Sequence, residues 1–131
     1  MAAVVLDTTV VIDLLRNQSG AVARLGVLRE AGDQPYVCAI TVEETYRGAR
    51  QTEREPTLRL FEGLRLAPLG VIEGRRAGDW RRESAHGGVT LAQADCLIAA
   101  AAVGIRGSLA TGNPKDFPME EVAVEHWPVG E

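Results

Sequence analysis

The stretch AVVLDTTVVIDLL, residues 3–15, contains the pattern that decides the fold. Residues 4–6 form an unbroken apolar run, which is typical of a strand buried on both faces of a parallel sheet. After Asp7, apolar residues recur at positions 10, 11, 14 and 15, which predicts an amphipathic helix over 8–16. A strand that passes directly into a helix indicates an α/β fold, with Asp7 at the carboxyl end of the first strand.

The remainder of the chain alternates between the same two patterns. Further strands are expected over 35–40, 66–69, 108–111 and 122–126, and helices over 20–31, 41–50, 56–64, 71–83 and 90–103. Because βαβ connections are right-handed, this order predicts a three-layer α/β/α fold with a central, mostly parallel sheet of four to five strands. No repeat or linker divides the chain, so residues 1–131 are expected to form a single domain. Ligands in such folds bind beyond the carboxyl ends of the strands.

Composition and charge exclude several classes of protein. The 131 residues include 14 Lys and Arg against 18 Asp and Glu, and this net charge of −4 argues against a simple polycationic nucleic-acid binder. Cys38 and Cys96 lack the spacing of zinc ligands, so we expect small buried side chains in a reducing compartment. No signal-peptide pattern is present, and the longest apolar stretch, 96–103, is too short to span a bilayer. The expected location is the cytoplasm, without membrane contact.

Three acidic residues have a structural explanation as well as a functional one. Asp7 is placed to cap the helix that follows it. Glu44 completes the pattern Thr41-x-x-Glu44, which is a capping box. Asp116 lies in the expected turn 112–118, where an acidic residue needs no function. Taken singly, none of the three identifies a site.

Asp95 is harder to explain structurally. The pattern Thr90-x-x-Gln93 predicts a capping box at the start of its helix, so Asp95 is not required as a cap. Its neighbours at three- and four-residue spacing are apolar, and a carboxylate on an apolar helical face is costly unless it is paired or coordinated. A buried ion pair with an arginine is the alternative, but a functional carboxylate is favoured.

A single parallel sheet would bring all four acidic residues toward one edge. Carboxylates gathered without basic partners repel one another unless a cation joins them. A site rich in oxygen atoms and free of His and Cys suits Mg²⁺ or Mn²⁺, and Thr111 and Asn113 add oxygen atoms at this edge. The chain has no Ser-His-Asp set, phosphate-binding glycine loop or GxGxxG motif, so nucleophilic triads and nucleotide-binding loops have no support.

Four ordered motifs span nearly the whole chain: LDTTVVIDLL (6–15), ITVEETYRGAR (40–50), TLAQADCLIAAAA (90–102) and TGNPKDF (111–117). Together they resemble the motifs of PIN-domain ribonucleases, most closely the VapC-type toxins of type II toxin–antitoxin pairs. The resemblance implies that an acidic quartet holds Mg²⁺ or Mn²⁺ and carries the catalysis, namely Asp7, Glu44, Asp95 and Asp116. It also implies that three further residues orient those carboxylates or a water molecule, namely Thr8, Thr111 and Asn113.

The last motif departs from the family pattern at Gly112, where an arginine is common. Lys115 is therefore a candidate for the cation that contacts the scissile phosphate. The implied activity is metal-dependent hydrolysis of structured RNA, such as a tRNA or an rRNA hairpin, by in-line attack of water.

The resemblance also implies protein partners. These are a second copy of the chain, in a homodimer, and a VapB-like antitoxin that lays a short segment across the active-site groove. Apolar residues of the helices expected over 41–50 and 53–64 are candidates either for these contacts or for the core, namely Val42, Tyr46, Leu58, Leu60 and Phe61.

Arginines in the middle of the chain are candidates for RNA contacts. Arg75 and Arg76 precede Trp80, and Arg81 and Arg82 follow it, so the group offers cations for phosphates and an indole ring for stacking on a base. The alternative is a solvated helix with internal ion pairs.

Two other functional classes remain open. A PIN-like module that only binds a partner, without catalysis, is one alternative. The other is a different Mg²⁺-dependent α/β protein, a phosphatase or a receiver domain. The phosphatase would need an aspartate where Thr9 stands, and a receiver needs a central aspartate, although none occurs between Asp33 and Asp79.

Overall fold

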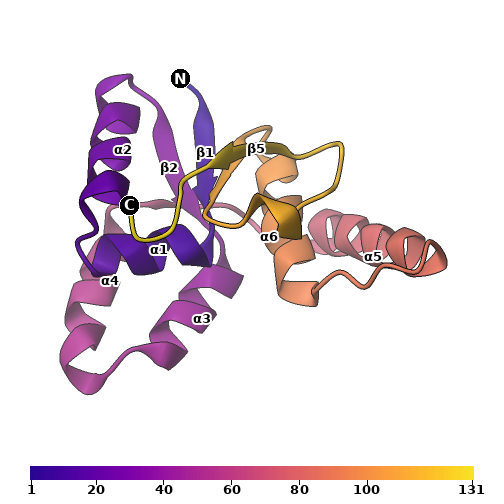
Figure 1. Cartoon of the computed structure of the whole chain (residues 1–131), viewed down its shortest axis with the longest axis horizontal. Helices are drawn as coiled ribbons and strands as arrows, with labels where there is room; N and C mark the ends of the chain where they lie inside the picture. The colour runs from indigo at the N-terminus through magenta and orange to yellow at the C-terminus, as the bar shows by residue number, and fades with distance from the viewer.

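Five parallel strands form the central sheet of the computed structural model, which describes residues 1–131 (Figure 1). The strand order is β3-β2-β1-β4-β5, and every neighbouring pair is parallel. This confirms the predicted parallel sheet of four to five strands, with five strands present. The strands are β1 Ala3–Leu6, β2 Gln34–Val37, β3 Arg65–Leu66, β4 Ser108–Thr111 and β5 Ala123–His126.

Helices cover both faces of the sheet, which confirms the three-layer arrangement. In Figure 1, α1, α2 and α4 lie on the left of the molecule, α6 lies below β5, and α5 lies at the right. The helices are α1 Thr8–Leu15, α2 Ser19–Glu30, α3 Ala39–Gly48, α4 Arg54–Glu62, α5 Val71–His86 and α6 Gln93–Gly104. Two short 3₁₀ helices complete the chain, η1 Gln51–Glu53 and η2 Pro114–Asp116. No helix combines the length and the apolar character that crossing a membrane requires.

The core has two layers, one on each face of the sheet. Successive residues of β1 point to opposite faces, so Val4 and Leu6 pack with Val11 of α1, whereas Val5 packs with Ile98 of α6. All of these side chains are at most 3% exposed. The unbroken apolar run that suggested a parallel strand therefore reflects burial on both sides.

Both cysteines are buried and free, as the sequence predicts. Burial raises the pKa of the Cys38 and Cys96 thiols, which favours the protonated form of both.

The order of the strands reverses at the centre of the sheet. The chain moves outward from β1 to β2 and β3, and then returns to place β4 on the other side of β1. The backbone N–H of Asp7 donates to the carbonyl of Ala110 at 2.9 Å, which extends the β1–β4 pairing to the carboxyl edge. Such a reversal leaves a crevice beyond the carboxyl ends of the two strands, and Asp7 and Thr111 lie at this edge.

Two predicted capping boxes are absent, because the helices begin at other residues. The helix expected from Thr41 begins at Ala39, so Thr41 is a fully buried residue of the first turn and forms no capping box with Glu44. The helix expected from Thr90 begins at Gln93, and no side chain caps it. The segment before α6 has a tertiary contact instead, because Nε of Arg81 donates to the carbonyl of Leu91 at 3.3 Å.

Candidate active site

Asp7 is a buried carboxylate held by two hydroxyl groups. Its side chain is 5% exposed, and Oδ2 accepts hydrogen bonds from Thr9 Oγ1 at 3.0 Å and from Thr111 Oγ1 at 2.7 Å. Asp7 occupies the N-cap position of α1, but its carboxylate makes no capping bond to the helix backbone. The capping explanation is therefore wrong, and Oδ1 accepts no hydrogen bond from the protein.

Glu44 is held in place by Thr8, one of the residues expected to orient the carboxylates. It lies half-buried in α3, and its Oε1 accepts a hydrogen bond from Thr8 Oγ1 at 2.8 Å. Thr8 Oγ1 also lies 3.1 Å from Thr41 Oγ1. Since a carboxylate only accepts and each hydroxyl has one proton, Thr41 donates to Thr8 and Thr8 donates to Glu44. This relay orients Glu44 from the first turn of α1.

Asp95 lies in the first turn of α6, because the helix starts later than the sequence suggests. Partial burial, followed by repulsion from Asp116, Asp7 and Glu44, raises the pKa of Asp95 to about 6. Each other member of the acidic quartet thus lies within electrostatic range of Asp95. The N-terminal end of a helix favours an anion at this position, but here it does not offset desolvation and three like charges.

No basic side chain neutralises the acidic quartet. The ion pairs of the molecule are Arg47–Glu43 at 3.6 Å and Arg59–Glu55 at 3.2 Å, both exposed and both outside the quartet. The alternative of a buried ion pair for Asp95 is therefore wrong. An unpaired group of like charges at a strand crevice is the electrostatic arrangement expected of a cation or phosphoryl-transfer site.

Asp116 stands at the exposed rim of the site. It ends the 3₁₀ helix η2, and its Oδ2 accepts a hydrogen bond from Asn113 Nδ2 at 2.9 Å. The backbone N–H of Asn113 in turn donates to Thr111 Oγ1 at 3.0 Å. Asn113 therefore links the Asp116 carboxylate to the hydroxyl group that holds Asp7. Lys115 is exposed beside them and forms no ion pair.

The acidic quartet does not form a closed cage. No three His, Cys, Asp or Glu side chains lie close enough together to hold a metal ion by themselves. This is compatible with Mg²⁺, which commonly binds through one or two carboxylates and completes its shell with water and substrate phosphate.

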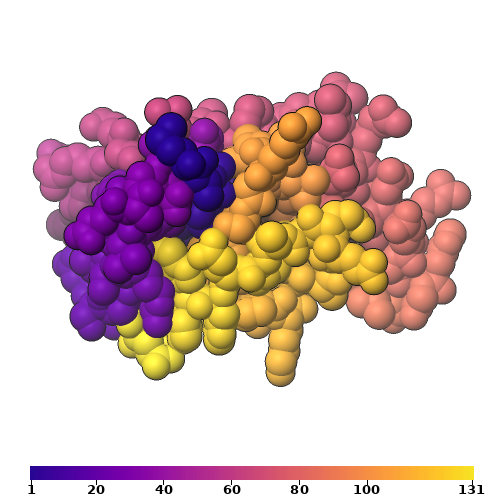
Figure 2. Space-filling view, turned by 90° about the horizontal axis from the view of Figure 1, so that it is seen from above, coloured from indigo at the N-terminus to yellow at the C-terminus, as the bar shows by residue number.

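The C-terminal segment lies against the site and explains Gly112. A Cβ atom at position 112 would collide with Cγ2 of Val129 and would lie 3.2 Å from the carbonyl oxygen of Trp127. The backbone N–H of Gly130 donates to the buried carboxylate of Asp13 at 2.8 Å, which fixes the segment on α1. Figure 2 shows these last residues, in yellow, against the indigo and violet N-terminal part of the chain. The place of an arginine side chain at 112 is thus taken by the chain itself.

Restoring an arginine at this position is expected to destabilise the protein. Gly112→Arg should lower the free energy of unfolding by about 1–3 kcal/mol, because the new side chain overpacks against Val129 and Trp127. Chemical denaturation measures the effect. The double variant with Val129→Gly should recover part of the loss, and an unchanged stability of the single variant would contradict the packing described here.

The predicted arginine group on α5 is only partly supported. Arg75, Arg81 and Arg82 are exposed, and Arg76 is half-buried. Trp80 is not available to stack on a base, because it is 7% exposed and its Nε1 donates to the carboxylate of Glu121. The stacking hypothesis is therefore wrong. In Figure 1, α5 lies at the end of the molecule opposite α3 and α4.

Two residues that hold the site were missed by sequence reasoning. Thr9 bonds Asp7 directly and also accepts the backbone N–H of Gly112 at 2.9 Å. Thr41 belongs to the relay that orients Glu44. The signal for Thr9 is its position two residues after Asp7, a spacing at which hydroxyl groups often form local hydrogen bonds.

Comparison with known proteins finds related sequences. The PIN domain family matches residues 4–123. Ribonuclease VapC19 of Mycobacterium tuberculosis is 30% identical over 118 residues, which cover 87% of this chain and 91% of that protein.

Solved structures share the fold. The VapBC2 structure from Rickettsia felis, bound to a promoter DNA fragment, contains a chain with a TM-score of 0.84 and 19% identity, covering 95% of this chain and 98% of that one. A toxin-antitoxin complex from Klebsiella pneumoniae gives a TM-score of 0.74 and 24% identity, covering 92% and 95%. The extent of the family match and the similarity to VapC19 show that this chain belongs to the PIN domain family, in the group of VapC ribonucleases.

Proposed function

We propose that this protein is a VapC-type endoribonuclease toxin that hydrolyses phosphodiester bonds of structured RNA, such as tRNA or rRNA, with Mg²⁺ or Mn²⁺ held by the acidic quartet. The observation that carries the proposal is the set of unpaired carboxylates at the strand crossover. Their mutual repulsion contributes to the raised pKa of Asp95. Membership in the PIN domain family favours this interpretation over a phosphatase or a receiver domain.

The side chains of the quartet suit a hard divalent ion. All four offer carboxylate oxygen atoms, none is neutralised by a basic side chain, and Oδ1 of Asp7 is free of protein hydrogen bonds. When bound, the ion would polarise the phosphoryl oxygen, lower the pKa of a water molecule and stabilise charge on the leaving oxygen.

The chain's own residues orient the reacting groups. Thr9 and Thr111 hold Asp7, Thr8 holds Glu44, and Asn113 holds Asp116, so three carboxylates are fixed before substrate arrives. With a pKa of about 6, Asp95 is partly protonated at pH 6 without a cation, and positive charge in the site favours loss of this proton. The N-terminal end of α6 faces the same edge and favours a phosphate there.

Inhibition by a VapB-like antitoxin in the cytoplasm, and assembly as a homodimer, complete the proposal. Support for the partner comes from the solved toxin-antitoxin complex of similar fold. Among the candidate apolar contacts, Val42, Leu60 and Phe61 pack on the core beside α1 and α2. Leu58 is 46% exposed and is the best placed of the group to meet a partner.

Incubation of the purified protein with total cellular RNA tests the proposed function. Discrete cleavage products are expected with Mn²⁺, and EDTA should abolish them because the quartet then lacks its cation. Cleavage that persists in EDTA would contradict metal dependence. The absence of any cleavage in Mn²⁺, together with stable binding of an antitoxin, would instead identify a PIN-like interaction module.

A further inference from the structure

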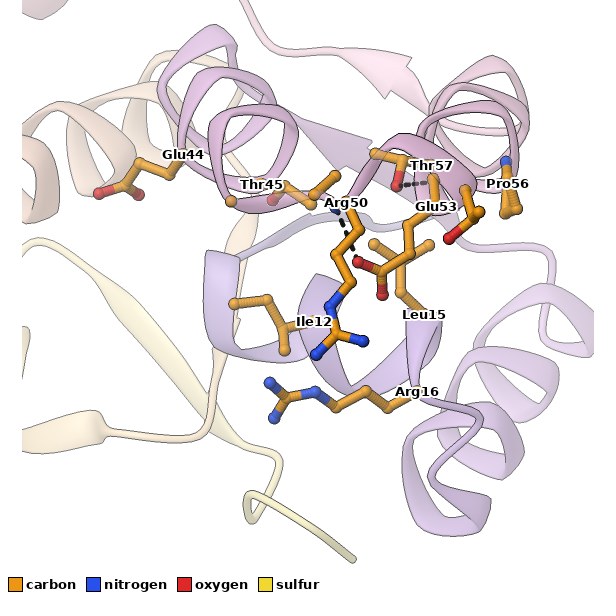
Figure 3. Close-up of a pocket in the computed structure, with 12 residues that line it drawn as sticks. Ile12, Leu15, Arg16, Glu44, Thr45, Arg50, Glu53, Pro56 and Thr57 are labelled. Atoms are coloured by element: carbon orange, nitrogen blue, oxygen red, sulfur yellow. Dashed lines mark hydrogen bonds between the residues drawn. The ribbon is translucent and has the colours of Figure 1, made fainter.

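A second feature of the molecule is a polar pocket of about 520 Å³ between α1, α3 and α4 (Figure 3). Only three of its 12 lining residues are hydrophobic, so it differs from an apolar docking groove. Glu44 of the acidic quartet lines one edge of the pocket, with its carboxylate turned away from the pocket (Figure 3), so the pocket lies beside the candidate active site.

Two guanidinium groups without a carboxylate partner stand in this pocket. Arg16 follows the last residue of α1, and Arg50 precedes η1. In Figure 3 the Arg50 side chain points toward the Arg16 side chain, which lies across its end. Neither forms an ion pair, and the nearby Glu53 carboxylate accepts from the backbone N–H of Arg50 at 2.8 Å rather than from its guanidinium. Two unneutralised arginines that converge in a polar pocket are suited to bind a phosphate.

A buried hydroxyl group in the same pocket also lacks a partner. Thr45 of α3 is 6% exposed, and its Oγ1 makes no hydrogen bond within the protein. A buried unpaired hydroxyl costs about 1–3 kcal/mol, and because this oxygen is shielded from solvent, a ligand in the pocket bonds it once the side chain rotates toward the pocket. The neighbouring Thr57 shows the contrast, because its hydroxyl donates to the Glu53 carbonyl at 2.7 Å.

We propose that Arg16, Arg50 and Thr45 form a subsite for the RNA strand beside the scissile bond, with the arginines on a phosphate and Thr45 on a phosphate or 2′-hydroxyl oxygen. The inference rests on the proposed ribonuclease function, and it specifies where the RNA strand lies after it leaves the acidic quartet. A strand cleaved at the quartet must continue away from it, and this pocket lies beside Glu44. The two arginines supply positive charge within a pocket that also contains Glu44 and Glu53, in a chain whose net charge is −4.

The test compares charge-neutral variants in binding and cleavage of a fluorescein-labelled tRNA transcript. The Arg16→Gln/Arg50→Gln protein should show a KM about tenfold higher or more, an unchanged kcat, and a salt dependence of binding flatter by about 0.7 for each lost phosphate contact. The matched control is Arg47→Gln, which removes an exposed α3 arginine already paired with Glu43. Its KM should stay within about twofold of the wild type.

Thr45→Val separates a ligand contact from a structural role. It should raise the KM a few-fold without loss of stability, because the hydroxyl has no partner in the free protein. If the wild type cleaves the RNA and the double arginine variant has the same KM and the same salt dependence, the subsite is overturned but the proposed function is not. Loss of antitoxin binding with unchanged RNA affinity would also overturn it and would assign the pocket to an acidic segment of the antitoxin. A wild-type protein that neither binds nor cleaves RNA would overturn both the subsite and the proposed function.

Discussion

Asp7→Asn is expected to lower the rate of RNA cleavage by at least about a hundredfold while leaving the protein folded. Asparagine has nearly the same shape, and its amide oxygen can accept the hydrogen bonds of Thr9 and Thr111 that now reach Asp7 Oδ2. The substitution therefore removes the negative charge at the centre of the site without opening a cavity in the core. Gel analysis of total RNA measures the cleavage, and thermal unfolding verifies the fold.

Asp79→Asn provides the matched control for this variant. Asp79 is exposed on α5 and takes part in no ion pair, so the same change of charge should leave cleavage at the wild-type rate. Cleavage by Asp7→Asn at the wild-type rate would show that the buried carboxylate is structural.

Asp95→Asn is expected to stabilise the ion-free protein at neutral pH, although it should also abolish cleavage. The pKa of Asp95 is about 6 in the folded state, against an ordinary value of 3.8 for an aspartate. Between these two values the folded state binds more protons than the unfolded state, so stability falls as pH rises from about 4 to about 6. Asparagine carries no charge, so the stability of the variant should not fall in this way as the pH rises.

Unfolding by urea in EDTA, at pH 4 and at pH 7, measures the difference. The wild type should lose more stability than Asp95→Asn over this interval, and Asp79→Asn should follow the wild type. A variant that is less stable than the wild type at pH 7, or that has the same pH dependence, would contradict the repulsion assigned to Asp116, Asp7 and Glu44.

The sequence predicts the layers and the sheet well because both depend on local periodicity. The apolar run of β1 and the stripe of α1 need no distant information, and the alternation of strands and helices implies parallel pairing. The clustering of acidic residues at one edge follows from the same topology. The distances between the four carboxylates cannot be predicted from the topology, since these distances depend on side-chain packing.

Errors arose where tertiary contacts override a local pattern. The capping boxes at Thr41 and Thr90 match the sequence rule, but Thr41 is buried against Thr8 and the chain at Leu91 bonds Arg81. In the sequence, Gly112 suggests the loss of a functional arginine. In the structure, Val129 lies so close to Gly112 that a side chain there would collide with it, and no local motif encodes this contact. Arg16 and Arg50 lie 34 positions apart and line one pocket only because α1 packs beside α3 and α4.

Calorimetric titration of Mn²⁺ into the RNA-free protein tests most directly whether the acidic quartet is one divalent-ion site. The wild type should bind the ion with release of protons at pH 6, because the raised pKa of Asp95 leaves this carboxyl partly protonated until a cation arrives. Asp95→Asn should bind more weakly and release fewer protons. A wild type that binds no Mn²⁺, or an Asp95→Asn variant with the same affinity and proton release, would contradict the site.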